Sequence, residues 1–384
     1  MTAAPLLLHV FPTFRAGGSQ LRFAAIANHF AGGYRHAVLA MDGRYDCLAR
    51  LSAGVDVQTW DIFAPKKNTI PNVLKFRRVL HARKPDLLVT YNWGALEWAF
   101  ANRPRVVPHL HIEDGFGPEE AQRQFRRRVL ARRFALANSL VVVPSQTLCD
   151  IALNLWRLPK ERVRHIPNGI DVARFAAVSN PIEAPVGTGP VIGTVAALRP
   201  EKNIARLLRA VHAVQKGTPC RLIVAGDGPE RLRLQAMANE LLASGSFLFL
   251  GNVDAVERVY ATLDIFALSS DTEQMSTSLM EAMAAGLPVV STNVGDVARM
   301  VAAENRPFIV GPDEVLFSDA LSRMVREQRM RSDLGAANRS VANVRFGAEK
   351  MYSEYDSLFL TLIESAYARA LARKLATASG HNAE

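Results

Sequence analysis

Short apolar runs alternate with longer amphipathic segments along nearly the whole chain. In the first half, the short runs occupy 6–10, 37–40, 87–90, 106–109 and 140–143. The pattern restarts after residue 190, with runs at 191–195, 221–225, 247–250, 265–268, 288–291 and 307–310. Buried parallel strands covered by helices on both faces have this pattern. We therefore predict an α/β protein with two Rossmann-like domains, each built on a doubly wound parallel sheet.

The two series of runs are separated by a segment that lacks periodicity. Residues 179–190 contain three prolines and two glycines, which is typical of a linker. We predict a first domain over 1–180 and a second over 181–345. Residues 346–384 then read as a long helix that packs back on the first domain and ends in a frayed tail. Because ligands bind at the carboxyl ends of parallel strands, we expect the site in a cleft where the two domains face each other.

Composition narrows the class of protein, and the charge distribution is uneven. The net charge of the 384 residues is +10, but residues 1–180 contain 25 Lys and Arg against 13 Asp and Glu. The remainder is close to neutral, so the basicity belongs to the first half.

The three cysteines are far apart, which argues against a disulfide framework or a structural zinc site. No run reaches the ~18–20 apolar residues of a membrane span, and we expect a cytoplasmic protein.

The richest polar segment runs from 269 to 290 and contains two glutamates. Glu273 follows the predicted strand at 265–268, and Glu281 lies inside a helix that we expect to begin near Ser276. The first backbone N–H groups of such a helix are unpaired and favour an anion. The two carboxylates could therefore bracket a phosphate and its attached polyol. Alternatively, both glutamates are solvated surface residues.

Two further kinds of signal lie on turns that follow strands. Arg199 and Lys202 follow the run at 191–195, where cations can neutralise a diphosphate without a metal, although a solvated helix start would look similar. Glycines mark the other turns, at 17–18 after the first run and at Gly226 after 221–225. Neither turn has the complete dinucleotide-binding spacing, and both could be simple tight turns.

Taken in order, these motifs resemble glycosyltransferase family 4, a group of retaining enzymes with the GT-B architecture of two Rossmann-like domains. The resemblance spans nearly the whole chain and is strongest from 190 to 295. The matching elements are the glycine loop at 17–18, His111, IPNGIDVARF at 166–175, the Arg199/Lys202 loop, IVAGDGPER at 223–231, FLGNV at 249–253 and the segment from Glu273 to Glu281.

The resemblance implies a role for each matching residue. Arg199 and Lys202 would hold the donor diphosphate, and Glu281 would hold the nucleotide ribose. The catalytic positions are Glu273, which would bind donor-sugar hydroxyls and position the anomeric carbon, and His111, which would lie against the donor sugar. From the residues alone, His111 or the nearby histidine at 109 could equally be a packed strand-end residue. The remaining donor-binding positions are Gly17, Gly18, Gly226, Val253, Thr277, Ser278 and Leu279.

The implied activity is a retaining, metal-independent transfer from a nucleotide diphosphate sugar to a glycan or polyprenyl-diphosphate-linked acceptor, in exopolysaccharide or cell-envelope synthesis. No Asp-x-Asp motif follows a strand, so a divalent ion is not implied. We expect no cofactor, because the nucleotide diphosphate sugar is the donor substrate. Gln274, Met275 and Arg299 depart from the usual family pattern, which affects the choice of donor sugar more than the reaction. The alternatives are a GT-B-type nucleotide-sugar epimerase and a non-catalytic nucleotide-sugar-binding protein. The oligomeric state is not indicated.

The basic first half contains an arginine-rich helical stretch at 119–137. Six arginines lie between Arg123 and Arg133, with apolar residues available for one side of the helix. A basic amphipathic helix can rest on an anionic membrane, so we expect peripheral contact with the cytoplasmic leaflet. A solvated helix face is the alternative. The stretch has little aromatic interleaving and no nucleic-acid-binding module, so nucleic acid is not an expected partner.

Overall fold

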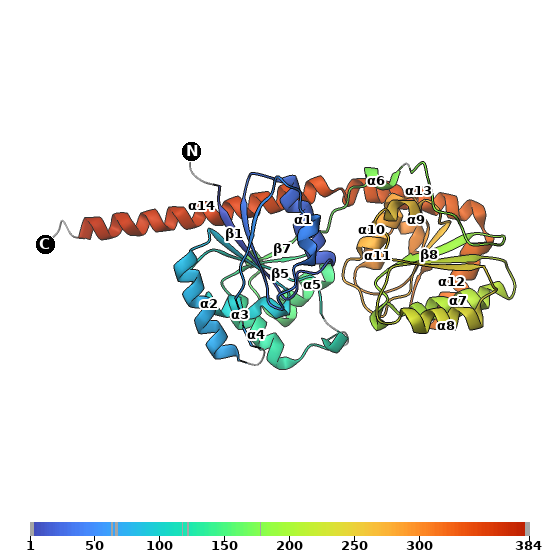
Figure 1. Cartoon of the computed structure of the whole chain (residues 1–384), viewed down its shortest axis with the longest axis horizontal. Helices are drawn as coiled ribbons and strands as arrows, with labels where there is room; N and C mark the ends of the chain where they lie inside the picture. The colour runs from blue at the N-terminus through green and yellow to red at the C-terminus, as the bar shows by residue number, and fades with distance from the viewer. Residues whose placement is uncertain are drawn as a thin grey trace. The chain divides into compact units, whose positions relative to one another are not determined.

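The chain forms two compact α/β units, each with its own parallel sheet (Figure 1). A computed structural model describes residues 4–62, 64–65, 68–116, 118–120, 123–176 and 178–380. Unit 1 comprises residues 1–166 and 351–384, and unit 2 comprises 167–350. The two predicted parallel-sheet domains are therefore confirmed. Residues 381–384, part of the expected frayed tail, lie outside the described residues.

Among the described residues of unit 1, seven strands form a parallel sheet in the order β3-β2-β1-β4-β5-β6-β7. The strands are β1 (Leu6–Phe11), β2 (Arg35–Ala40), β3 (Asp56–Thr59), β4 (Leu87–Tyr91), β5 (His109–Ile112), β6 (Leu140–Val143) and β7 (Val163–His165). The helices are α1 (Gly18–His29), α2 (Thr69–Arg83), α3 (Leu96–Ala101), α4 (Arg126–Leu136), α5 (Gln146–Asp150) and most of α14 (Ala348–Gly380).

Alternate side chains of β1 pack into the two layers that cover this sheet. Leu7 belongs to a core shared with α1 and α14, whereas Leu8 belongs to a core shared with α2 and α3. From α14, Met351, Tyr355 and Phe359 are buried in the first of these cores. The C-terminal helix therefore completes the core of unit 1 although it follows unit 2 in the sequence.

Unit 2 contains a six-stranded parallel sheet in the order β10-β9-β8-β11-β12-β13 within the described part of the chain. The strands are β8 (Val191–Val195), β9 (Arg221–Ala225), β10 (Phe247–Gly251), β11 (Ile265–Leu268), β12 (Val289–Thr292) and β13 (Ile309–Val310). The helices are α6 (Ala173–Ala176), α7 (Ile204–Gln215), α8 (Arg231–Leu241), α9 (Val256–Tyr260), α10 (Thr277–Ala284), α11 (Val297–Met300), α12 (Glu314–Arg326) and α13 (Gln328–Arg345). One core lies beneath α7, α8 and α12, and the other beneath α9 and α10.

Two expected segments are displaced in the structure. The strand expected at 106–109 is β5 at His109–Ile112, because the Asn102 side chain accepts hydrogen bonds from the backbone N–H groups of Val106 and Val107 and holds them in a loop. The division between the units falls after Ile166, not at 180. The segment 167–178 joins unit 2, where Ile170 pairs with Gly347 and is buried in that unit's core.

Candidate functional site

In unit 2, the loops that follow β8 and β11 meet at the carboxyl ends of their strands. The backbone N–H of Asp271 donates to Glu201 O at 2.8 Å, and the Ser269 hydroxyl donates to Lys202 O at 3.1 Å. Adjacent parallel strands place such loops at one edge of the sheet, where α/β proteins bind their ligands. Lys202 and Glu273 are thereby brought together, although 71 positions separate them in the sequence.

Lys202 and Glu273 form a close ion pair at this edge. The Lys202 ammonium lies 2.5 Å from Glu273 Oε1, and the Ser270 hydroxyl donates to the same carboxylate oxygen at 2.8 Å. The Lys202 side chain is 24% exposed and that of Glu273 is 9% exposed. The carboxylate is thus fixed by two donors, while the cation remains accessible to a ligand. Arg199, on the same loop, is exposed, and its side chain forms no hydrogen bond or ion pair with the described residues.

Gly226 allows two backbones at this edge to approach each other closely. Its φ is +123°, and a Cβ at this position would lie 1.9 Å from Ala196 O. The neighbouring backbone N–H of Leu198 donates to Asp227 O at 2.9 Å, so the turn after β9 braces the loop that carries Arg199. The structure therefore gives Gly226 a packing role beside the loop of the predicted site. Val253 lies on the loop after β10 and is partly buried.

Helix α10 begins where the sequence pattern predicted. Ser276 is its N-cap, and the Ser276 hydroxyl accepts a hydrogen bond from Leu279 N at 3.4 Å. The first residues of the helix, Thr277 and Ser278, follow the loop that contains Glu273. The positive end of the helix dipole is therefore at the start of α10, where it favours an anion.

Glu281 lies farther along α10 and is held by a residue that the sequence analysis missed. The Tyr260 hydroxyl donates to Glu281 Oε2 at 2.8 Å and also lies 3.1 Å from Ser278 O. Burial raises the pKa of Glu281 to about 7 and also raises that of Tyr260. In the sequence, Tyr260 cannot be distinguished from an ordinary apolar position of α9. Only the tertiary packing shows that its hydroxyl contacts a carboxyl group.

The residues that depart from the family pattern lie on or beside the loop that contains Glu273. Gly295 has a φ of +54°, and a Cβ there would lie 2.3 Å from Glu273 O. The next residue, Asp296, donates its backbone N–H to Gln274 O and forms an ion pair with Arg299 at 3.2 Å. The Arg299 side chain is thus tied to its own turn, and Met275 is partly buried in the core of unit 2.

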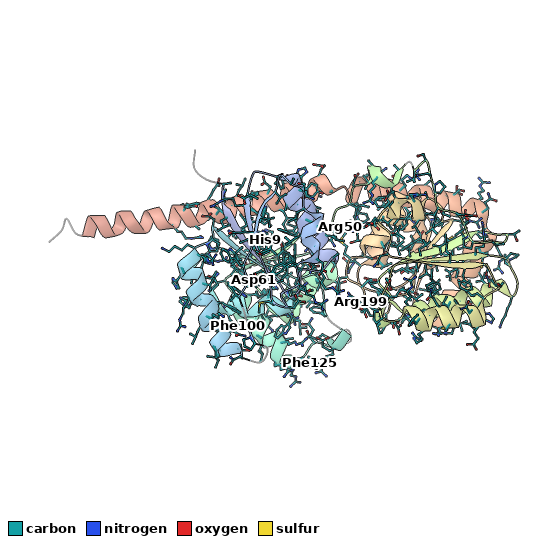
Figure 2. All side chains as sticks on the ribbon, in the orientation of Figure 1. His9, Arg50, Asp61, Phe100, Phe125 and Arg199 are labelled. Atoms are coloured by element: carbon teal, nitrogen blue, oxygen red, sulfur yellow. The ribbon has the colours of Figure 1, made fainter. Side chains whose placement is uncertain are left out.

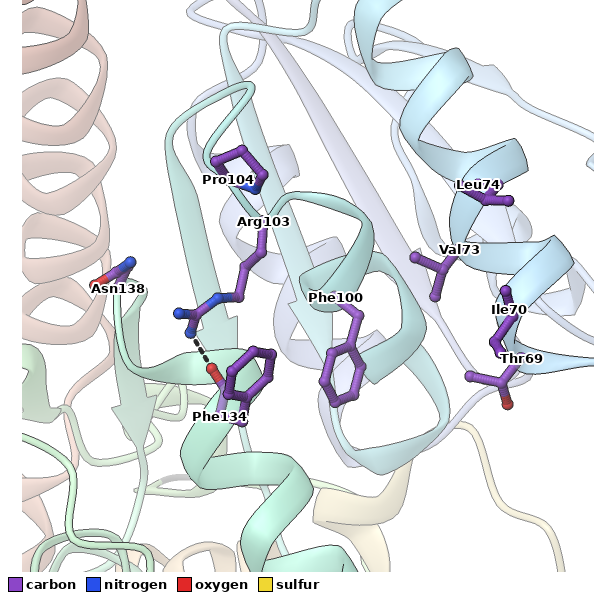
Figure 3. A pocket seen from close by; sticks show the side chains of 9 residues that line it. All are labelled: Thr69, Ile70, Val73, Leu74, Phe100, Arg103, Pro104, Phe134 and Asn138. Carbon is purple, nitrogen blue, oxygen red and sulfur yellow. Dashed lines mark hydrogen bonds between the residues drawn. The ribbon is translucent and has the colours of Figure 1, made fainter.

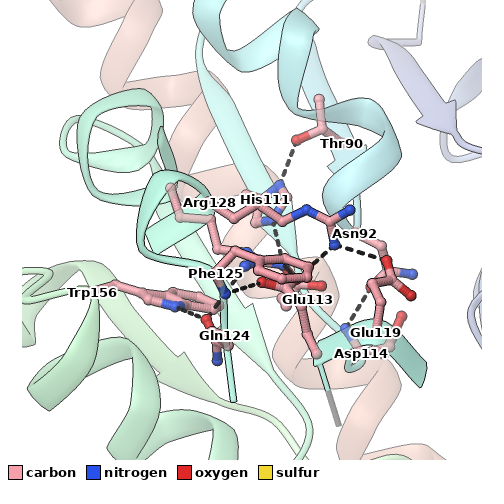
Figure 4. A network of polar contacts seen from close by, with 12 residues as sticks. Thr90, Asn92, His111, Glu113, Asp114, Glu119, Gln124, Phe125, Arg128 and Trp156 are labelled. Atoms are coloured by element: carbon pink, nitrogen blue, oxygen red, sulfur yellow. Dashed lines mark hydrogen bonds and ion pairs between the residues drawn. The ribbon is translucent and has the colours of Figure 1, made fainter. Parts of the chain in front are cut away.

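In unit 1, His111 is the third residue of the four-residue strand β5 and is packed within the sheet. Its ring is fully buried in β5, and Nδ1 is 2.8 Å from the Thr90 hydroxyl, which is also 2.8 Å from His109 Nε2 (Figure 4). The other ring nitrogen, His111 Nε2, is 3.7 Å from Glu113 Oε2 and forms no hydrogen bond with the described residues. Thr90 thus links both candidate histidines, and burial lowers the pKa of His109.

Glu113 connects His111 to the arginine-rich helix. Arg132 is buried and donates to Glu113 at 3.3 Å and to Glu120 at 3.2 Å. Arg128 donates to Glu119 and Glu120 at 2.8 and 2.9 Å, as Figure 4 shows in part. Two of the six arginines expected on a membrane-facing surface are therefore engaged inside unit 1. The exposed ones are Arg123, Arg126, Arg127 and Arg133.

The glycine loop of unit 1 opens helix α1. Gly17 is the N-cap in an extended conformation, and a Cβ on Gly17 would lie 2.9 Å from the side-chain oxygen of Gln20. A Cβ on Gly18 would face open space, so nothing in the described structure prevents a ligand from approaching there. A second buried histidine group, His9 with His36 at 3.1 Å, lies among the core side chains of unit 1 (Figure 2). It is a packed pair, and burial lowers both pKa values.

Comparison with known proteins identifies the family. Residues 16–174 match the family model described as Glycosyltransferase Family 4, and residues 179–341 match the model described as Glycosyl transferases group 1. The chain belongs to the glycosyltransferases that these two models describe. The resemblance seen in the sequence is thereby confirmed for both halves of the chain.

Individual relatives cover part of the chain. A GDP-mannose-dependent α-mannosyltransferase of Mycobacterium tuberculosis is 34% identical over 189 residues, which is 47% of each chain. The putative glycosyltransferase EpsF of Bacillus subtilis is 31% identical over 53% of this chain and 55% of its own length. The chain thus spans about half the length of the curated relatives it matches.

Solved structures support the fold over a longer range. The crystal structure of HepE from Anabaena, in complex with UDP, has a TM-score of 0.75 at 18% identity and covers 92% of this chain and 99% of its own. At this identity, the likeness establishes the GT-B type of domain fold and nothing finer.

Proposed function

We propose that this chain transfers a sugar from a nucleotide diphosphate sugar to a glycan or polyprenyl-diphosphate-linked acceptor, with retention of the anomeric configuration. The observation that carries the proposal is the Lys202–Glu273–Ser270 cluster at the carboxyl ends of β8 and β11. A cation beside a carboxylate suits a ligand that joins a phosphate to a polyol. Family membership and relatives named as an α-mannosyltransferase and a putative glycosyltransferase support the same reaction class.

The proposed reaction needs no metal. The bond between the anomeric carbon and the donor phosphate breaks, and its electron pair stays on the leaving diphosphate. The acceptor hydroxyl bonds to the anomeric carbon from the same face and passes its proton to that phosphate. Lys202 and the exposed Arg199 stabilise the negative charge that develops on the leaving group. Glu273, positioned by two donors, binds the sugar hydroxyls.

We place the reaction in exopolysaccharide or cell-envelope synthesis at the cytoplasmic membrane surface. Relatives include a lipopolysaccharide core biosynthesis glycosyltransferase of Rhizobium meliloti, which supports an envelope role. Among the described residues, the structure contains no helix that is both long and apolar enough to span a bilayer. The membrane contact that we propose is peripheral and uses the exposed arginines near α4.

A two-stage experiment tests this function. A thermal-shift screen with UDP-, GDP- and ADP-sugars identifies the donor, and a transfer assay with envelope acceptors then measures turnover. Lys202→Ala should lower kcat/KM by roughly 10–100-fold, because a charge-assisted contact is worth ~1.5–3 kcal/mol. Glu273→Gln should lower kcat while the protein remains folded.

Matched controls are Lys216→Ala and Glu240→Gln, which alter exposed residues of the same unit. Unchanged turnover in both site variants would refute the assignment of the site. Epimerised nucleotide sugar without glycoside product would instead establish the epimerase, and donor binding without any product would establish the binding protein.

A further inference from the structure

Unit 1 contains an apolar pocket between α2, α3 and the end of α4 (Figure 3). Its volume is about 600 Å³, within the ~300–1,000 Å³ of small-molecule sites. The wall is formed mainly by hydrocarbon and aromatic side chains, which include Ile70, Val73, Leu74, Phe100 and Phe134. The Phe100 and Phe134 rings stack with centroids 6.0 Å apart and make one rigid wall.

The apolar residues at the mouth of the pocket are unusually exposed. Ile70 is 75% exposed, Leu74 is 52% exposed and Phe134 is 60% exposed. Leu130 lies one helical turn before Phe134 on α4 and is 63% exposed. Several large exposed apolar side chains around one cavity indicate an interaction site rather than ordinary surface.

The charged groups at this pocket are cationic. Arg103 lines it, with its guanidinium 4.4 Å from the centre of the Phe134 ring and donating to Phe134 O. Arg77 on α2 lies at the edge of the pocket, where it donates to the backbone oxygens of Ala101 and Pro104, each at 2.9 Å. No acidic residue is among the described lining residues. The exposed Arg126, Arg127 and Arg133 of α4 add to the positive charge.

We propose that this pocket receives a hydrocarbon chain of an anionic phospholipid from a bilayer, while the surrounding arginines face the headgroup phosphates. The lining offers few polar groups, so it does not suit a sugar or a nucleotide, each of which needs several hydrogen bonds. A second copy of the chain would bring the same excess of positive charge to this face. A hydrocarbon chain with a negative headgroup complements both the apolar wall and the cations.

This assignment rests on the membrane contact in the proposed function but on no step of sugar transfer. It moves that contact from the arginines of α4 alone to a surface shared by α2 and α4. Vesicle binding and sugar transfer are measured separately, so either can fail while the other stands.

The test is flotation of the full chain with vesicles of phosphatidylcholine, with and without phosphatidylglycerol. We expect binding that requires phosphatidylglycerol and that falls by about 100-fold or more in the variant Ile70→Ser/Leu74→Ser, because the variant removes two large apolar side chains whose burial in the bilayer favours binding. The matched control is Leu232→Ser/Val344→Ser, which removes two even more exposed apolar residues from helices of unit 2 and should bind normally.

A second measurement locates the lipid chain. Phe100→Trp places an indole on the pocket wall, and phosphatidylglycerol brominated in its acyl chains should quench this variant more than the wild type, whose own tryptophans provide the baseline. Absence of vesicle binding, equal binding by Ile70→Ser/Leu74→Ser, or no additional quenching would overturn the proposal. A dimer that this double variant abolishes would overturn it as well, because the face would then be buried between copies.

Discussion

The carboxyl group of Glu281 makes the stability of unit 2 depend on pH. Burial raises its pKa from 4.5 to about 7. The folded state therefore keeps a proton that the unfolded chain releases at lower pH, so this residue's contribution is complete below about pH 4.5 and is lost as the pH rises to about 7. Such a shift corresponds to about 3 kcal/mol. Because solvent still reaches the partly buried side chain, we expect about 2 kcal/mol.

Glu281→Gln isolates this effect, since the neutral amide can still accept the hydrogen bond from Tyr260. The variant should match the wild type at about pH 4 and be more stable at about pH 8, by about 2 kcal/mol. Urea unfolding followed by far-UV circular dichroism measures this. All four tryptophans lie in unit 1, so their fluorescence reports that unit separately and should show no difference. Glu240→Gln is the exposed control. Equal pH dependence in the wild type and Glu281→Gln would show that the Glu281 carboxyl group does not cause the effect.

Two packing predictions concern the surroundings of the site. Gly226→Ala should destabilise unit 2 by about 3 kcal/mol or more in urea unfolding, because the added Cβ would overlap a backbone oxygen at a residue with positive φ. The control Gly217→Ala should change the stability little, because open space surrounds that position. Equal effects of the two substitutions would contradict this prediction. Thr90→Val should lower the free energy of unfolding of unit 1 by about 1–3 kcal/mol, because it leaves His109 and His111 without their shared hydroxyl partner. Thr90→Ser keeps the hydroxyl and should therefore retain this stability. Tryptophan fluorescence during unfolding measures the Thr90 variants, and a stable Thr90→Val would contradict the proposed link.

The local sequence pattern correctly predicted those elements that are specified by their own residues. The run at 191–195 is apolar enough to be buried on both faces, and it forms β8 as predicted. Ser276 caps α10 through an atom three residues away, which a short-range motif can indicate. Strand β5 was misplaced by three residues because a single side chain, Asn102, holds residues 106–107 in a loop.

The hydrophobic pattern of the sequence predicts the alternation of strands and helices and therefore the two parallel sheets, the second of which carries Arg199, Lys202 and Glu273 at its carboxyl edge. These follow from periodicity, which each segment contains in full. Three features follow from tertiary contacts instead: Lys202 meets Glu273, Tyr260 holds Glu281, and Arg132 of α4 is buried. Those outcomes depend on contacts between residues far apart in the chain, where packing and desolvation, rather than local pattern, set the partners.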